Sequence, residues 1–192
     1  AESNQKEITK SETEELIEPE KAGMMVLNTR KSALKTYLIY KERFENPIFL
    51  SKWVIPKDRL ARIKKTKELE KKGINRTLIA TQVVEAGVDL DFEWIFRDFA
   101  PFDSLIQIGG RCNRNLTIKN GTGHVKIAKL IDENKRAYTD YVYHKILLNS
   151  TDEIITEEFD EKEALKLLKA YFRLISRRVT EKGPWQSIQK GE

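Results

Sequence analysis

Two arginines with a spacing of three, Arg111 and Arg114, directly follow a pair of glycines in the stretch IQIGGRCNR. This spacing places both side chains on one side of a helical turn, and Gly109 and Gly110 remove side chains that would block the approach of another group. A guanidinium on such a turn can stabilise the charge of a phosphoryl group during its transfer. Taken alone, however, Arg111 and Arg114 are more simply two surface arginines of a basic protein, and a catalytic role for them depends on the motifs around them.

Polar residues follow three predicted strands of the chain. Asn28 and Thr29 follow the first of these strands, Ser51 and Lys52 follow the second, and the run ATQVVEAGVDLD begins as the third one ends. Ligands collect outside the carboxyl ends of the strands of an open parallel sheet. Hydroxyl, amide and ammonium groups at such an edge can contact phosphate oxygens without reading bases. Taken singly, each of these residues is also an ordinary turn residue.

ATQVVEAGVDLD and QIGGRCNR resemble motifs V and VI of superfamily-2 helicases, and RDFAPFDSLIQ between them is similar to a phrase of CRISPR-associated type I interference helicases. The resemblance implies a second RecA-like motor lobe in which Arg111 and Arg114 are arginine fingers. Ile108 stands where many relatives carry an arginine, so a contact from that position is not expected. The resemblance implies a nucleotide contact for Gly87, Asp89 and Gln107. It implies single-stranded DNA contacts for Asn28, Thr29, Ser51, Lys52, Thr81 and Gln82.

The implied cofactors are ATP and Mg2+, held mainly by a first RecA-like lobe. This chain has no G-x-x-x-x-G-K-[ST] loop and no D-E-x-[DH] box, so we predict that it is inactive as an ATPase by itself. The implied partners are the first lobe, single-stranded DNA, an HD nuclease domain or subunit, and a guide-RNA surveillance complex. Two alternatives stay open: a lobe of another superfamily-2 helicase acting on RNA or duplex DNA, and a non-enzymatic nucleic-acid-binding module.

The composition is compatible with these expectations. The 192 residues carry 35 Lys and Arg against 30 Asp and Glu, a net charge of +5 that suits a polyanionic partner. One cysteine, Cys112, excludes an internal disulfide, and we find no signal peptide and no run of eighteen apolar residues. These features favour a reducing cytosol and no membrane partner, and the resemblance implies that the cytoplasm is that of a prokaryote. His124 and His144 lack metal-ligand spacing, so no metal site is predicted, and Cys112 is interpreted as a packing residue.

Short apolar segments alternate with amphipathic ones, which predicts an α/β fold with an open, mostly parallel sheet, helices on both faces and additional C-terminal helices. The resemblance implies that this sheet is RecA-like. Strands are predicted at 24–28, 47–50, 77–81, 94–100 and 124–131. Helices are predicted at 30–44, 56–72, 133–148 and 161–178, and a short helix capped by Asp103 or Ser104 runs toward Arg111. Trp94 is predicted to be core, whereas Trp53 is the only tryptophan near the proposed nucleic-acid edge.

Three parts are predicted along the chain. Residues 1–22 form an acidic, partly disordered lead-in, because Glu2 to Glu20 is acidic and low in aromatic residues. Residues 23–132 form the RecA-like lobe, and residues 133–192 form a C-terminal helical extension. The segment 161–178 is so apolar that we expect more than one face of its helix to be covered.

Overall fold

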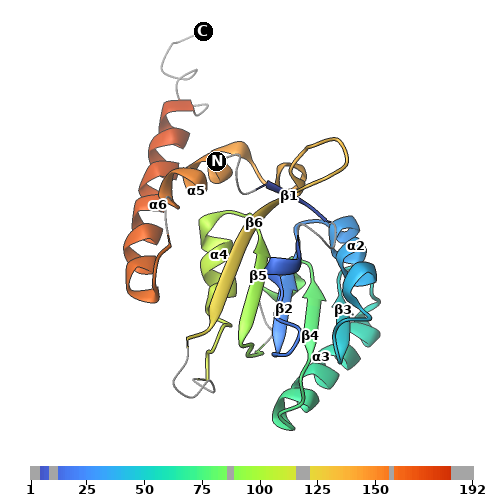
Figure 1. Ribbon diagram of the computed structural model, residues 1–192. Helices are drawn as coiled ribbons and strands as arrows, with labels where there is room; N and C mark the ends of the chain where they lie inside the picture. The colour runs from blue at the N-terminus through green and yellow to red at the C-terminus, as the bar shows by residue number, and fades with distance from the viewer. Residues whose placement is uncertain (1–4, 9–12, 86–88, 116–121, 156–157, 183–192) are drawn as a thin grey trace.

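A six-stranded sheet forms the centre of the computed structural model, which describes residues 5–8, 13–85, 89–115, 122–155 and 158–182. The strand order is β1-β6-β5-β2-β4-β3, and all neighbouring strands are parallel (Figure 1). This arrangement confirms the predicted α/β fold. The strands are β1 (Gln5–Glu7), β2 (Gly23–Val26), β3 (Pro47–Leu50), β4 (Thr77–Ala80), β5 (Trp94–Asp98) and β6 (His124–Ile131).

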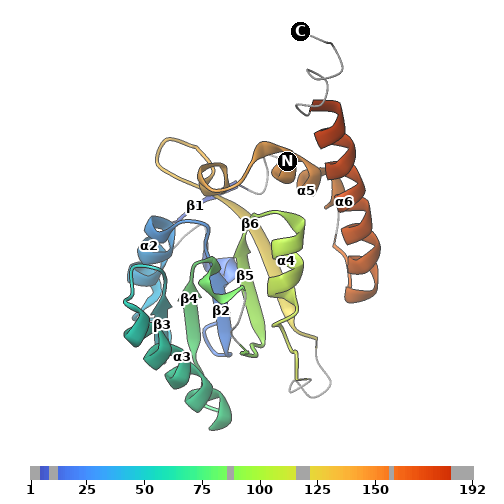
Figure 2. The ribbon, with the colours of Figure 1, turned by 180° about the vertical axis from the view of Figure 1, so that it is seen from behind.

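Helices cover both faces of the sheet, as Figures 1 and 2 show from opposite sides. Successive residues of a strand point to opposite faces, so β2 sends Met25 into one apolar cluster and Met24 into the other. Helix α2 (Arg30–Tyr40) packs on the face of Met25. Helices α3 (Pro56–Lys71) and α4 (Phe102–Gly109) pack on the face of Met24. The sheet is thus packed on both faces, by one apolar cluster on each.

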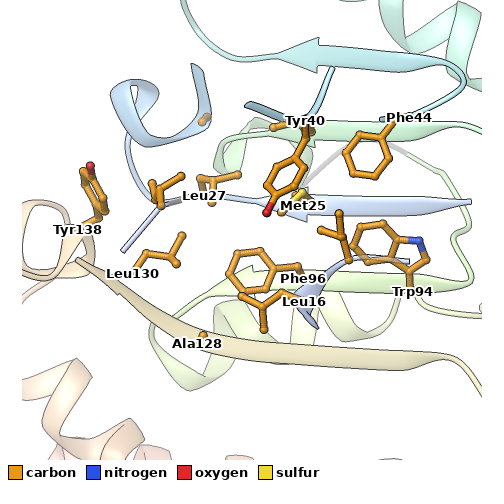
Figure 3. Close-up of a cluster of buried hydrophobic side chains, with 14 residues drawn as sticks. Leu16, Met25, Leu27, Tyr40, Phe44, Trp94, Phe96, Ala128, Leu130 and Tyr138 are labelled. Carbon is orange, nitrogen blue, oxygen red and sulfur yellow. The ribbon is translucent and has the colours of Figure 1, made fainter. Parts of the chain in front are cut away.

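Trp94 belongs to the cluster beneath α2, and Figure 3 shows its ring near that of Phe44. The two ring centroids are 6.3 Å apart, and the indole Nε1 of Trp94 donates to the carbonyl of Lys21 at 3.1 Å. The indole also lies against the backbone of Gly23, since a Cβ added there would be 1.9 Å from its ring. The prediction of Trp94 as a core residue is confirmed.

We expect Gly23→Ala to lower the free energy of unfolding by about 1–3 kcal/mol, because the new methyl group displaces the Trp94 indole from a packed core. Gly109→Ala is the matched control, since a Cβ at Gly109 meets nothing within 4 Å and alanine suits the end of a helix. Urea denaturation of both variants measures the difference. Equal stability of the two variants would contradict the close contact between Gly23 and Trp94.

The described part of the lead-in packs on the sheet. Strand β1 pairs with β6, and a 3-10 turn, η2 (Glu14–Leu16), follows it. Ile8, Leu16 and Ile17 are buried in the cluster beneath α2. The expectation of a solvated segment is therefore wrong for these residues. Their apolar side chains gain free energy from burial, while the neighbouring Glu14 and Glu15 stay exposed.

The predicted helix at 133–148 is wrong. The Asp132 carboxylate accepts from the backbone N–H groups of Asn134 and Arg136, and Lys135 has a φ of 61°, so the chain turns here. A 3-10 turn, η4 (Tyr138–Tyr141), comes next, followed by α5 (Lys145–Ile154). The side chain of His144 caps α5 by accepting from the N–H of Ile146.

The boundaries of α2 and α4 also differ from the predictions. Helix α2 ends at Tyr40, and Phe44 reaches the core from the turns that follow. Helix α4 begins after Pro101 and has no capping side chain, so neither Asp103 nor Ser104 is its cap.

The C-terminal helices lie beside α4, away from α2 and α3 (Figure 1). Tyr171 of α6 (Glu161–Lys182) is fully buried, with its ring centroid 5.8 Å from that of Phe102. Leu165, Phe172 and Val179 of the same helix remain at least half exposed. None of the described helices combines the length and apolar character that crossing a membrane requires.

Candidate functional site

The predicted nucleic-acid residues follow three neighbouring strands at one edge of the sheet. The N–H of Leu27 donates to the carbonyl of Ala80 at 2.9 Å, and the N–H of Thr81 donates to that of Leu50 at 3.1 Å. These bonds extend the pairing of β2, β4 and β3 past their assigned ends. The edge therefore brings together Asn28, Thr29, Ser51, Lys52, Thr81 and Gln82.

Asn28 is buried at this edge, and its polar groups bond within the protein. Its Nδ2 donates to the carbonyl of Phe99 at 2.7 Å, and its Oδ1 accepts from the Arg97 guanidinium at 2.7 Å. Its backbone N–H donates to Asp98 and its carbonyl accepts from Gln82. These contacts make Asn28 a support of the sheet edge.

Thr29 and Ser51 also have local structural contacts. The Thr29 side chain caps α2 by accepting from the N–H of Ser32 at 3.0 Å, in a reciprocal capping box. Ser51 is fully buried, and its hydroxyl accepts from the N–H of Trp53 at 3.1 Å. Lys52, the residue after the buried Ser51, is exposed. Of the six predicted contact residues, Lys52 is the one that presents an exposed positive charge.

An aromatic residue next to Lys52 shares its exposure. The ring of Trp53 is 52% exposed, and the Arg30 guanidinium lies 5.1 Å from its centroid. Thr81 follows β4, which lies between β2 and β3 in the sheet, and its side chain is buried. Positive charge and an aromatic face thus lie together on the solvent side of the β3 end, a combination suited to a single strand.

The two arginines lie on a turn that is held by the segment before β5. The carbonyl of Arg111 accepts from the N–H of Phe92 at 3.1 Å. The Asp91 carboxylate accepts from the N–H groups of Arg114 and Asn115 at 2.8 and 3.0 Å. Asp91, the last residue of ATQVVEAGVDLD, therefore fixes the backbone at the end of QIGGRCNR. Asp91 was not among the predicted site residues, although it ends the run ATQVVEAGVDLD.

The side chains of the two arginines differ in accessibility. Arg114 is half exposed and forms an ion pair with the exposed Asp89. Arg111 is partly buried, and its Nη2 donates to the carbonyl of Glu85 at 2.8 Å. Burial, and after it the charge of Arg114, lowers the pKa of Arg111, but an arginine stays protonated in proteins. Both groups are therefore cations, and Arg114 is the one open to a phosphate.

The arginine turn and the polar edge lie at opposite ends of β5. The backbone of Cys112 forms an isolated β-bridge with that of Phe92, which precedes β5. Asn28, in contrast, contacts Asp98 at the other end of β5. The predicted residues thus form two groups, which the segment from Gln82 to Asp91 connects. Gln107 is exposed on α4, and Gly87 lies outside the described residues.

Cys112 sits inside the arginine turn with its thiol partly buried. Burial is the main cause that raises its pKa to about 12, so the thiol is protonated at neutral pH. The sulfur contacts the carbonyls of Glu93 and His124 at 3.6 and 3.5 Å. These contacts agree with a packing role. The described residues include no group of three His, Cys, Asp or Glu side chains arranged to hold a metal.

A buried charged residue of β5 was missed at the sequence level. Arg97 is 0% exposed and forms an ion pair with Glu85 at 2.8 Å. Its neighbour Asp98 is also buried, which raises the pKa of that carboxyl to about 7 against the opposing charge of Arg97. A signal for this network is present in the sequence, because Arg97 and Asp98 stand inside the otherwise apolar run WIFRDFA. Charged residues in a buried strand need partners, so such a pair indicates a buried ion pair or hydrogen-bond network.

The chain is similar to known proteins over much of its length. Residues 19–117, just over half of the chain, match the family described as CRISPR-associated nuclease/helicase Cas3, C-terminal. A CRISPR-associated nuclease/helicase Cas3 of Haloferax volcanii is 44% identical over 80 residues, which are 42% of this chain and 8% of that protein. A Cas3 of Methanothermobacter thermautotrophicus is 29% identical over 143 residues, 73% of this chain and 16% of that protein. The chain thus spans less than a fifth of these curated relatives.

Solved structures have the same fold. The crystal structure of T. fusca Cas3-AMPPNP superposes with a TM-score of 0.68 at 20% identity, covering 90% of this chain and 23% of that one. A chain of a CRISPR RNA-guided surveillance complex, pre-nicking, superposes with a TM-score of 0.63 at 22% identity, covering 85% and 23%. At these identities the likeness concerns the fold.

Proposed function

Because the chain belongs to the family of Cas3 nuclease/helicase C-terminal domains, we propose that it is the second motor lobe of an ATP-dependent superfamily-2 DNA helicase in CRISPR defence. The observation that carries this proposal is the arginine turn. Asp91 holds the turn by two backbone hydrogen bonds, and the turn presents the half-exposed guanidinium of Arg114. A first lobe completes the motor by supplying the phosphate loop and the Mg2+ ligands that this chain lacks.

The residues of the arginine turn fit a triphosphate. Arg114 carries the accessible cation, and phosphate oxygens would compete with Asp89 for its guanidinium. Arg111 adds a second positive charge, while Gln107, Asp89 and Gly87 are proposed to contact the nucleotide. ATP, when bound between the lobes, supplies the phosphoryl group whose developing charge the arginines stabilise. Closure of the lobes and hydrolysis are thereby coupled.

The polar edge is proposed to hold single-stranded DNA. Lys52 and Trp53 supply an exposed ammonium group and an exposed ring, which suit a phosphate and a base. The backbone that would line the DNA is held in place by the other residues of the edge, which include Thr29 and Gln82. The buried residues of this group are Asn28, Ser51 and Thr81.

The proposed partners of the whole protein are an HD nuclease domain or subunit and a guide-RNA surveillance complex, in the cytoplasm of a prokaryote. No HD motif is present in this chain, so the nuclease would belong to residues or chains other than these 192 residues. Both proposed partners follow from family membership and from the names of the matched relatives.

The isolated chain should show no ATPase activity and only weak binding to single-stranded DNA that weakens as salt rises. Lys52→Ala should weaken this binding and reduce the slope of log affinity against log salt by about 0.7, the value expected for one lost phosphate contact on a single strand. Fluorescence anisotropy with a labelled oligonucleotide at several salt concentrations measures both quantities.

Lys71→Ala is the matched control, because Lys71 is an exposed lysine at the far end of α3 from Lys52. Identical affinities of the two variants would remove Lys52 from the DNA site. Robust ATP turnover by the isolated chain would overturn the two-lobe proposal, because it would require a complete phosphate site within these residues.

A further inference from the structure

The guanidinium of Arg97 is completely buried and is surrounded by oxygen acceptors. Its Nη1 donates to the side chain of Asn28 at 2.7 Å and to the carbonyl of Asp98 at 2.8 Å. Its Nη2 donates to the Glu85 carboxylate at 2.8 Å and to the Tyr143 hydroxyl at 3.0 Å. Such a set of bonds holds a planar guanidinium in one orientation.

The acceptors of Arg97 come from segments that are far apart in the sequence. Asn28 follows β2, and Glu85 follows η3 (Gln82–Val84), the 3-10 turn after β4. Tyr143 follows η4 in the C-terminal extension, and its hydroxyl also accepts from Gln82 at 3.3 Å. The extension therefore reaches both the polar edge and the charge network through one hydroxyl group.

Glu85 connects this network to the arginine turn. Its carboxylate binds Arg97, and its backbone carbonyl accepts from Arg111 at 2.8 Å. A continuous series of contacts thus runs from the Tyr143 hydroxyl through Arg97 and Glu85 to Arg111. Glu85 is mostly buried, and burial raises the pKa of its carboxyl while the adjacent Arg97 charge opposes that rise.

We propose that Arg97, Glu85 and Tyr143 are positioning residues that fix Arg111 relative to the polar edge. The inference rests on the proposed motor function and adds to it, because it assigns the C-terminal extension a part in setting the catalytic arginine. Arg97 contacts neither nucleotide nor DNA in this scheme. It acts through the carboxylate of Glu85, whose main chain holds Arg111.

A role in stability alone is a weaker account of this network. Burying an ion pair costs desolvation free energy that its attraction barely offsets, so apolar residues of similar volume often stabilise a core equally well. What the network provides is a fixed geometry between the ends of β2 and β5, the segment after η3 and the C-terminal extension. Displacement of a catalytic group by about 1 Å can cost about 10^2 in rate.

Tyr143→Phe in the complete two-lobe protein tests the proposal, because it removes the hydroxyl and keeps the ring. We expect kcat for DNA-stimulated ATP hydrolysis to fall about tenfold, with KM for ATP and the Kd for single-stranded DNA within about twofold of the unchanged protein. Glu85→Gln should lower kcat further, since it also weakens the bond that orients Arg97. Combining both substitutions should give less than the product of the single effects, because they act through one network.

Tyr141→Phe is the matched control, since the hydroxyl of Tyr141 donates to Asp132 at 2.7 Å, away from Arg97. It should leave kcat unchanged. A kcat for Tyr143→Phe equal to that of Tyr141→Phe, or effects of Tyr143→Phe and Glu85→Gln that simply multiply, would overturn the positioning role. A fall in thermal stability with kcat unchanged would do the same.

Turnover of Arg114→Ala and Tyr143→Phe distinguishes an error in the positioning role from an error in the motor function. If Arg114→Ala stops turnover while Tyr143→Phe does not change it, only the positioning role is wrong. If Arg114→Ala also leaves turnover unchanged, the motor function itself is wrong and the positioning role is lost with it.

Discussion

Arg114→Ala, introduced into the two-lobe protein, should lower DNA-stimulated ATP turnover by about 10^3-fold or more, the range seen when an arginine finger is lost in related phosphoryl-transfer systems. The physical reason is that the Arg114 guanidinium is half exposed on a turn held by Asp91, so it can meet charge that develops on a phosphate. Single-stranded DNA binding should stay largely intact, because the polar edge lies at the other end of β5. Steady-state ATPase assays with and without DNA, together with anisotropy, separate the two properties.

Arg173→Ala serves as the control for Arg114→Ala. Arg173 is an exposed arginine on α6, so its loss removes the same charge from a distant part of the surface. Arg114→Lys keeps the charge but loses the planar fork of donors, and it should restore only part of the activity. Turnover of Arg114→Ala equal to that of Arg173→Ala would exclude Arg114 as a catalytic residue.

Asp91→Ala should lower ATP turnover by about 10^2-fold without comparable loss of DNA binding, because a misplaced catalytic group reacts slowly even when it is present. The Asp91 carboxylate accepts from the N–H groups of Arg114 and Asn115, so alanine releases the turn that carries Arg114. The backbone carbonyl of Asp91 still accepts from Arg76 in this variant, which favours retention of the fold. Turnover, DNA affinity and urea denaturation should be measured on the same preparation.

Asp58→Ala is the matched control, since Asp58 is an exposed aspartate in the first turn of α3. Asp91→Asn keeps one acceptor oxygen and should fall between Asp91→Ala and the unchanged protein. An Asp91→Ala protein that is destabilised yet turns over ATP normally at low temperature would show that the carboxylate supports the fold and not the geometry of Arg114.

The sheet could be predicted where local signals agree with one another. The strands β3 and β6 occupy the predicted residues, because β3 begins at the Asn46-Pro47 break and β6 begins directly after Gly123. The basic helix α3 begins at Pro56 and ends before Gly73, whose φ is 63°. Apolar residues with local start and stop signals are sufficient for such elements.

Elements that depend on distant partners were predicted poorly. Strand β1 forms only because β6 offers a free edge, and the acidic residues around it indicate a solvated segment instead. The turn after β6 replaces the expected helix because the Asp132 side chain takes the N–H groups of Asn134 and Arg136. Helical periodicity in 133–148 contains no information about that competition.

By itself, the sequence determined the family, the parallel α/β fold and the identity of the candidate arginines, since these depend on residue type and spacing along short stretches. Which of the candidates reach solvent depends on how the folded segments pack. Arg114 and Lys52 do, whereas Asn28 is buried against Arg97, 69 residues away. The tertiary structure also decided that Tyr143 joins the network across 46 residues. Burial and hydrogen-bond partners arise from segments that meet on folding, and no local pattern encodes which segments those are.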